Sequence, residues 1–83
     1  MRMSVAGNLL TPAYLTIIER GYAVRRKGDF WIAVKGDDTF TARDPISLLG
    51  VIAVGEARGE NWRATDEQIK EFQALDAGPR GGG

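Results

Sequence analysis

The stretch DPISLLGVIAVGEARG, residues 44–59, holds the longest apolar run of the chain and decides its fold. Asp44 is suited to the N-cap of a helix and Pro45 to its first turn, where a missing N–H costs nothing. The rest of the run leaves little polar surface, so a helix here must be covered on several sides. The alternative is a buried strand, because the segment GVIAVG is β-branched and bounded by glycine. The Asp-Pro start and the polar Glu-Ala-Arg ending favour the helix.

A further helix is predicted near the N-terminus. Thr11 and Pro12 repeat the start signal of the first helix, with Thr11 as the N-cap. Leu15 and Ile18 mark the apolar face of this helix. Gly21 stands where a residue of left-handed conformation would end it.

Between these two helices the apolar period changes to two, which predicts strands at residues 22–26, 30–35 and 39–43. Glycine and aspartate in both connections are typical of tight hairpin turns, each read here as three residues long. One face of the sheet should be apolar and covered by helices. The residues expected on this covered face are Phe30, Ile32, Val34, Phe40 and Ala42.

The last helix is predicted to begin at Thr65, with Gln68 completing a capping box. Ile69, Phe72 and Leu75 recur on one side of this helix and are expected to form its buried stripe.

Together these elements predict an α+β fold: a three-stranded antiparallel meander packed on one face by two to three helices, in the order α-β-β-β-α-α. Residues 1–10 are expected to form a partly ordered lead-in and residues 11–76 a single domain. The glycine-rich residues 77–83 have nothing to bury and are expected to be disordered.

The chain has 83 residues and no net charge, and it contains neither cysteine nor histidine. This composition excludes a disulfide framework, a thiolate nucleophile and a soft metal site, so no cofactor or metal is expected. The N-terminus lacks the apolar core of a signal peptide, and the apolar run is about half the length that a membrane span needs. A cytoplasmic location, with no membrane partner, is therefore expected.

No constellation in the sequence indicates catalysis. Asp37 and Asp38 fall in a hairpin turn open to water, and Glu56 and Glu60 are expected to form a solvated ion cluster with Arg58. The two serines have no histidine to act as a base. We therefore expect the protein not to be an enzyme.

The favoured function is binding to another protein. Trp31 alternates with the residues of the covered face, so it is expected to point away from the core and to anchor a partner. The alternative is that Tyr14 or the lead-in covers it. The candidate partner-binding residues are Trp31, Arg25, Arg26 and Lys35.

Two other functions remain open. The cluster Arg25-Arg26-Lys27 could bind single-stranded nucleic acid beside Trp31, although three charges are few and acidic residues lie close by in sequence. Val51 and Val54 are expected to stay uncovered, because one small sheet and two helices cannot surround the 44–59 helix. With Gly55 beside them they predict self-association, most simply as a two-fold homodimer.

Overall fold

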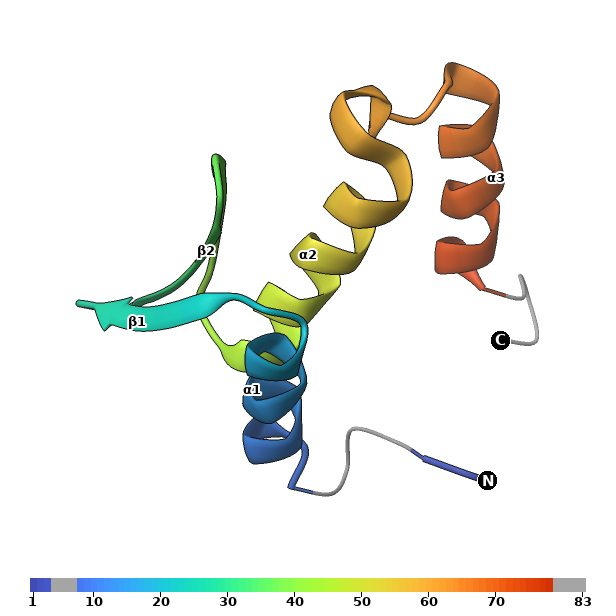
Figure 1. Ribbon diagram of the computed structural model, residues 1–83. Helices are drawn as coiled ribbons and strands as arrows, with labels where there is room; N and C mark the ends of the chain where they lie inside the picture. Colours follow the sequence, from blue (N-terminus) through green and yellow to red (C-terminus); the bar gives the residue numbers. More distant parts are fainter. Residues whose placement is uncertain (4–7, 79–83) are drawn as a thin grey trace.

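The computed structural model describes residues 1–3 and 8–78 and contains three α-helices, a short 3₁₀ helix and three strands there (Figure 1). Residues 4–7 of the predicted lead-in and residues 79–83 of the predicted tail lie outside the described residues. In chain order the elements are α1 (Leu10–Glu19), β1 (Ala23–Lys27), β2 (Phe30–Lys35), β3 (Asp38–Ala42), α2 (Pro45–Arg58), η1 (Gly59–Asn61) and α3 (Asp66–Ala77).

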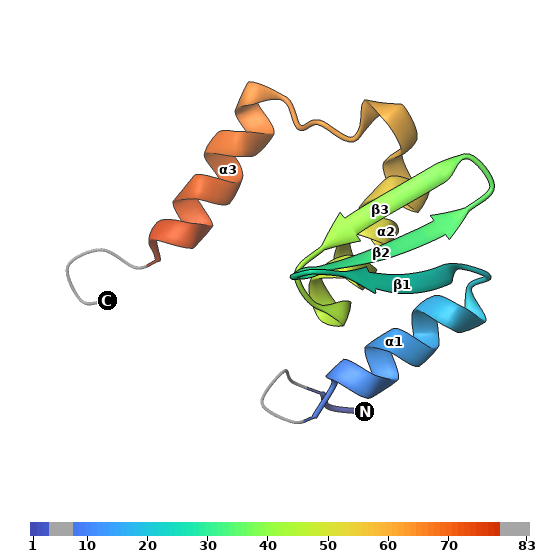
Figure 2. The ribbon, with the colours of Figure 1, turned by 90° about the vertical axis from the view of Figure 1, so that its left-hand side faces the viewer.

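The strands form one antiparallel sheet in the order β1-β2-β3, and both α1 and α2 contact it. The predicted α+β fold, with the element order α-β-β-β-α-α, is confirmed. The helix prediction for the central apolar run is confirmed as well, since α2 spans all of it. Two helices, α1 and α2, pack on one face of the sheet, as Figure 2 shows.

Each hairpin turn is one residue shorter than predicted. Lys27 pairs with Phe30 in the first hairpin and Lys35 with Asp38 in the second, which leaves two residues in each turn. The glycine that opens each turn has φ of 60°, a conformation that glycine adopts without strain. Side chains alternate between the two faces of a strand. A shift of one residue in the pairing therefore places each residue of β1 and β3 on the same face as the other set of β2 side chains.

The helices consequently cover the face of the sheet that was predicted to be exposed. Ala33 of β2 is fully buried and pairs with Val24 on one side and Phe40 on the other, and all three face the helices. The small side chain of Ala33 lets a helix approach the sheet closely. The prediction for the covered face was therefore wrong for the residues of β2, which are Phe30, Ile32 and Val34.

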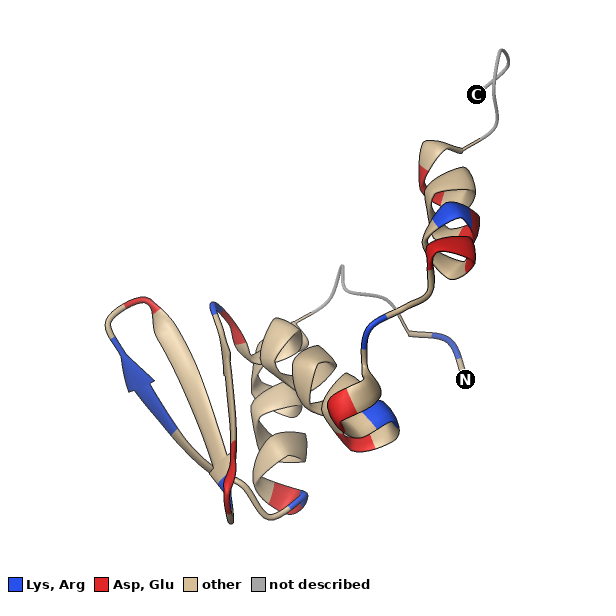
Figure 3. Cartoon of the chain, turned by 90° about the horizontal axis from the view of Figure 1, so that it is seen from above, with Lys and Arg blue, Asp and Glu red and all other residues tan. Residues whose placement is uncertain are grey.

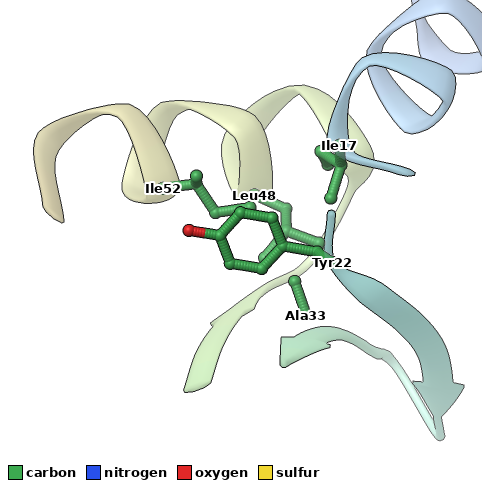
Figure 4. Close-up of a cluster of buried hydrophobic side chains, with 5 residues drawn as sticks. All are labelled: Ile17, Tyr22, Ala33, Leu48 and Ile52. Atoms are coloured by element: carbon green, nitrogen blue, oxygen red, sulfur yellow. The ribbon is translucent and has the colours of Figure 1, made fainter. Parts of the chain in front are cut away.

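The core lies between the covered sheet face, α1 and α2, and Figure 4 shows its side chains converging. Leu48 and Ile52, one turn apart on α2, are fully buried in it. Its other members are Ile17 of α1, Tyr22 just before β1, and Ala33.

Helix α1 differs from its prediction at both its start and its buried face. It begins at Leu10, its N-cap makes no side-chain hydrogen bond, and Thr11 lies inside the first turn, so Thr11 is not the cap. The start moves forward because Pro12 is tolerated anywhere in a first turn, where the N–H groups have no helical partner. Its buried residues are Ala13 and Ile17, whereas Leu15 and Ile18 of the predicted face are exposed.

The start of α2 matches its prediction. Asp44 Oδ1 accepts a hydrogen bond from the backbone N–H of Ser47 at 2.8 Å, and Oδ2 accepts one from the Ser47 hydroxyl at 2.9 Å. Pro45 follows in the first turn. These two hydrogen bonds, the backbone one first, lower the pKa of the Asp44 carboxyl below its ordinary value.

Replacing Asp44 tests this cap. At pH 7, Asp44→Ala is expected to lower the melting temperature by about 5 °C, whereas Asp44→Asn keeps a capping oxygen and should change it little. The lowered pKa means that the carboxylate stabilises the fold above its ordinary pKa. That stabilisation is lost as the pH falls through the lower folded value. The gap between wild type and Asp44→Ala in circular-dichroism melts should narrow in acid; a gap independent of pH would contradict this assignment.

Helix α3 is capped as predicted but stands apart from the rest of the fold. Thr65 Oγ1 accepts a hydrogen bond from Gln68 N at 3.2 Å and Gln68 Oε1 accepts one from Thr65 N at 2.9 Å, which confirms the capping box. All residues of α3 are exposed, and it packs against neither the sheet nor α1 nor α2 (Figure 2). The predicted buried stripe is therefore exposed: Ile69 by 41%, Phe72 by 64% and Leu75 by 82%.

Candidate interaction surfaces

Trp31 lies on the helix-covered face of β2 and is half-buried rather than exposed. Its ring meets that of Tyr14 edge-on with the centroids 6.3 Å apart, so Tyr14 covers it within the chain. The Arg26 guanidinium lies 5.7 Å from the centroid of the Trp31 ring. A groove beside α1 still reaches Trp31, and its lining includes Leu10, Tyr14, Val24, Arg25, Arg26 and Pro45.

The predicted basic cluster is divided between the two faces of the sheet. Arg26 lies on the side of Trp31, and its Nε donates a hydrogen bond to the Gly28 carbonyl at 3.2 Å. Arg25 and Lys27 are exposed and lie on the opposite face. Figure 3 shows these basic residues together along β1.

Lys35 has contacts within the fold. Its Nζ donates a hydrogen bond to the backbone oxygen of Arg20 at 2.8 Å, just after α1, and lies 5.3 Å from the centroid of the Tyr22 ring. A cation at this position interacts favourably with the carbonyl end of a helix. The structure thus gives Lys35 a stabilising role at the end of α1.

Glu56 of α2 joins three parts of the fold. One of its carboxylate oxygens accepts a hydrogen bond from Arg20 at 2.7 Å and the other accepts one from the Tyr22 hydroxyl at 2.9 Å. The expected cluster of Glu56 with Arg58 is not formed, because Arg58 Nε donates instead to the Trp62 carbonyl at 3.0 Å. Burial, together with the hydrogen bond to Glu56, raises the pKa of Tyr22.

The sheet face turned away from the helices, called here the open sheet face, has an apolar centre and a basic rim. In Figure 2, which looks onto this face, none of the described elements lies in front of the sheet, and α2 passes behind it. Phe30 is 42% exposed there, with the Arg43 guanidinium 5.2 Å from its ring centroid. Its residues are Ala23, Arg25, Lys27, Phe30, Ile32, Val34, Thr39, Thr41 and Arg43, of which three are basic and none is acidic.

A second uncovered apolar surface, the α2 groove, runs beside α2. Val51 and Val54 are 43% and 44% exposed, as the sequence led us to expect. With Phe40 and Trp62 they line a groove of about 740 Å³ whose lining contains no charged residue. The groove is thus mostly apolar, with Ser47 as its polar side chain.

Gly55, predicted to let a second copy approach, has a role inside the chain. A Cβ atom at this position would lie 2.5 Å from Phe40 Cε1 and 2.8 Å from Cζ. The missing side chain lets the Phe40 ring of β3 pack against α2, where it also meets Tyr22 edge-on at 5.9 Å between centroids. The close approach predicted for another copy is therefore already occupied by Phe40.

The exposed side chains Ile69, Phe72 and Leu75, called here the α3 stripe, form a third apolar surface. Helix α3 carries four acidic residues and one basic residue. Glu71 precedes Leu75 by four residues and Asp76 follows Phe72 by four, so both border the stripe. Lys70 is two residues from Phe72 and therefore lies on the opposite side of the helix.

In the described ranges, no three or more His, Cys, Asp or Glu side chains are grouped as metal ligands would be. None of the helices within these ranges is both long and apolar enough to cross a membrane. Comparison of the chain with protein-family models, curated proteins and solved structures found no match.

Proposed function

We propose that the chain is a small non-enzymatic protein-binding domain whose binding element is α3. The α3 stripe carries this proposal, because it presents three large apolar side chains to solvent on one side of a capped helix. A helix of 12 residues is only marginally stable alone, and most helices in proteins gain their stability by burying an apolar face. Laying such a face on another protein is a common mode of recognition.

Trp31 fits the role of main anchor less well than it did from the sequence alone. Its contacts with Tyr14 and Arg26 leave only part of the ring accessible through the groove beside α1. A binding hot spot usually presents most of an aromatic side chain to the partner. We therefore assign Trp31 to the packing of α1 on the sheet and place partner binding on the exposed stripe. The lack of cysteine supports a cytoplasmic setting.

A photo-crosslinking residue placed on α3 tests the proposal. Phe72→p-benzoyl-phenylalanine is expected to give crosslinked protein adducts in cells that make the chain, because position 72 lies at the centre of the stripe. Lys70→p-benzoyl-phenylalanine, on the opposite side of the same helix, is the matched control and should give few. Equal yields at both positions, or none at position 72, would contradict binding through the α3 stripe.

A further inference from the structure

We infer that α3 of one copy lies across the open sheet face of a second copy, and that two copies exchange these helices in a dimer. This inference rests on the proposed function and identifies the protein partner as the chain itself. It joins two surfaces that each lack a cover within the chain. A helix packed on a sheet face is one of the standard layer arrangements of protein domains.

The two apolar surfaces match in kind and in length. The α3 stripe spans seven residues of helix, from Ile69 to Leu75, a rise of about 9 Å, and presents three large side chains. The apolar centre of the open sheet face spans Phe30 to Val34 on β2, about 13 Å, and also has three large side chains, of which Phe30 is exposed and Ile32 and Val34 are half-buried. Docking would remove the exposed parts of both rows from water, and the burial of apolar surface favours association.

The charges of the two surfaces are complementary. The open sheet face carries Arg25, Lys27 and Arg43 and no acidic residue. Glu71 and Asp76 border the α3 stripe, and the single lysine of α3 lies on the far side of the helix. Figure 3 shows the basic strand and the acidic helix well separated in one chain, so these charges do not meet within one copy. Complementary charges of this kind favour the right partner and fix its orientation.

The short connection before α3 opposes docking on the open sheet face of the same chain. In Figure 1 the sheet lies on one side of α2 and α3 on the other. Packed layers are roughly 10 Å apart, so a helix on the open sheet face would lie about 20 Å from the layer of α2. The connection from Asn61, the last residue of η1, to Asp66, the first of α3, spans five Cα–Cα steps, at most about 18 Å when fully extended. A second copy can offer its open sheet face without this restriction.

The α2 groove is the other surface that the stripe could occupy, and the charges distinguish the two. The lining of the groove has no charged residue to pair with Glu71 or Asp76, whereas the open sheet face has three cations. Each copy has one α3 and one open sheet face. A reciprocal exchange therefore covers both surfaces of both copies, in a closed dimer with two identical contacts.

Charge reversal on each surface tests this arrangement in the full chain. We expect Arg25→Glu with Lys27→Glu, and separately Glu71→Lys with Asp76→Lys, each to weaken the dimer about tenfold or more, as measured by light scattering and sedimentation equilibrium. An equal mixture of the two charge-reversed chains should recover a dimer, because the reversed helix then meets the reversed face. In the same mixed dimer, the unaltered α3 of the first chain meets the unaltered open sheet face of the second.

Matched controls separate this contact from a general effect of charge. Arg26 lies on the helix-covered face of β1, and Lys70 lies on the side of α3 opposite the stripe. Arg26→Glu and Lys70→Glu should therefore leave the dissociation constant of the dimer unchanged. A wild-type chain that stays monomeric would overturn the inference. If position 72 still crosslinks to another protein in that case, the proposed function stands without it.

Two further outcomes would also overturn the inference. A dimer that neither charge reversal weakens would show that α3 docks elsewhere, for example in the α2 groove. A monomer that binds a fluorescein-labelled oligothymidylate at low salt, and loses that binding with Arg25→Glu and Lys27→Glu, would assign the open sheet face to single-stranded nucleic acid.

Discussion

Leu48→Ala is expected to lower the free energy of unfolding by about 2–5 kcal/mol, the usual loss for a large-to-small change in a core. Leu48 is fully buried at the centre of the contact between α2, α1 and the sheet. Small domains have about 5–15 kcal/mol of stability in total, so this one change should remove a large part of it. Urea unfolding followed by circular dichroism measures the difference.

Leu75→Ala is the matched control for this prediction, since it removes the same atoms from a leucine that is 82% exposed on α3. At a concentration where the wild type is monomeric, it should change the free energy of unfolding by no more than about 0.5 kcal/mol. A loss as large as that of Leu48→Ala would show that α3 belongs to the core of its own chain.

The second large effect is expected at Gly55. Gly55→Val should destabilise the fold by about 1–3 kcal/mol, because even its Cβ atom would lie 2.5 Å from the Phe40 ring. That ring is held between α2 and Tyr22 and cannot move away without losing its own packing. Thermal or urea unfolding of the variant measures the loss.

Gly50→Ala, on the same helix, should have the opposite sign. A Cβ atom at Gly50 would meet no other atom within 4 Å, so the substitution should gain roughly 1 kcal/mol from helix propensity alone. Stabilisation by both substitutions would contradict the packing of Phe40 against Gly55.

Local start and stop signals were readable from the sequence. Asp44 with Pro45, and Thr65 with Gln68, each supply a side-chain acceptor where helix N–H groups lack a partner, and the structure shows both caps. Gly21 ends α1 with φ of 94°, as predicted. Thr11 failed as a cap because its signal rested on Pro12, which any position of a first turn accepts.

The faces of the sheet were assigned wrongly, and turn length is the reason. Strand β2 is apolar on both faces, so its composition does not show which face the helices cover. The pairing register therefore determines which face of the sheet the helices cover. Two-residue turns opened by glycine would have placed Ala33 and Phe40 on the same face. This error also placed Trp31 on the wrong side and concealed the open sheet face.

The apolar pattern of α3 does not show whether this helix packs on the rest of its own chain. Its apolar period correctly predicts a helix with one apolar side. The same period arises whether that side meets its own core or another chain. Exposure of Ile69, Phe72 and Leu75 could therefore be learned only from the structure.

The molar mass of Phe72→Asp beside that of the wild type, at matched micromolar concentrations in light scattering, tests most directly whether the α3 stripe binds outside its own chain. We expect twice the chain mass of 9.0 kDa for the wild type and 9.0 kDa for the variant. The far-ultraviolet circular dichroism of the variant should remain that of a folded chain. A mass of 9.0 kDa for the wild type would contradict the exchange of α3 between two copies. A variant that unfolds would place the stripe in the core of its own chain.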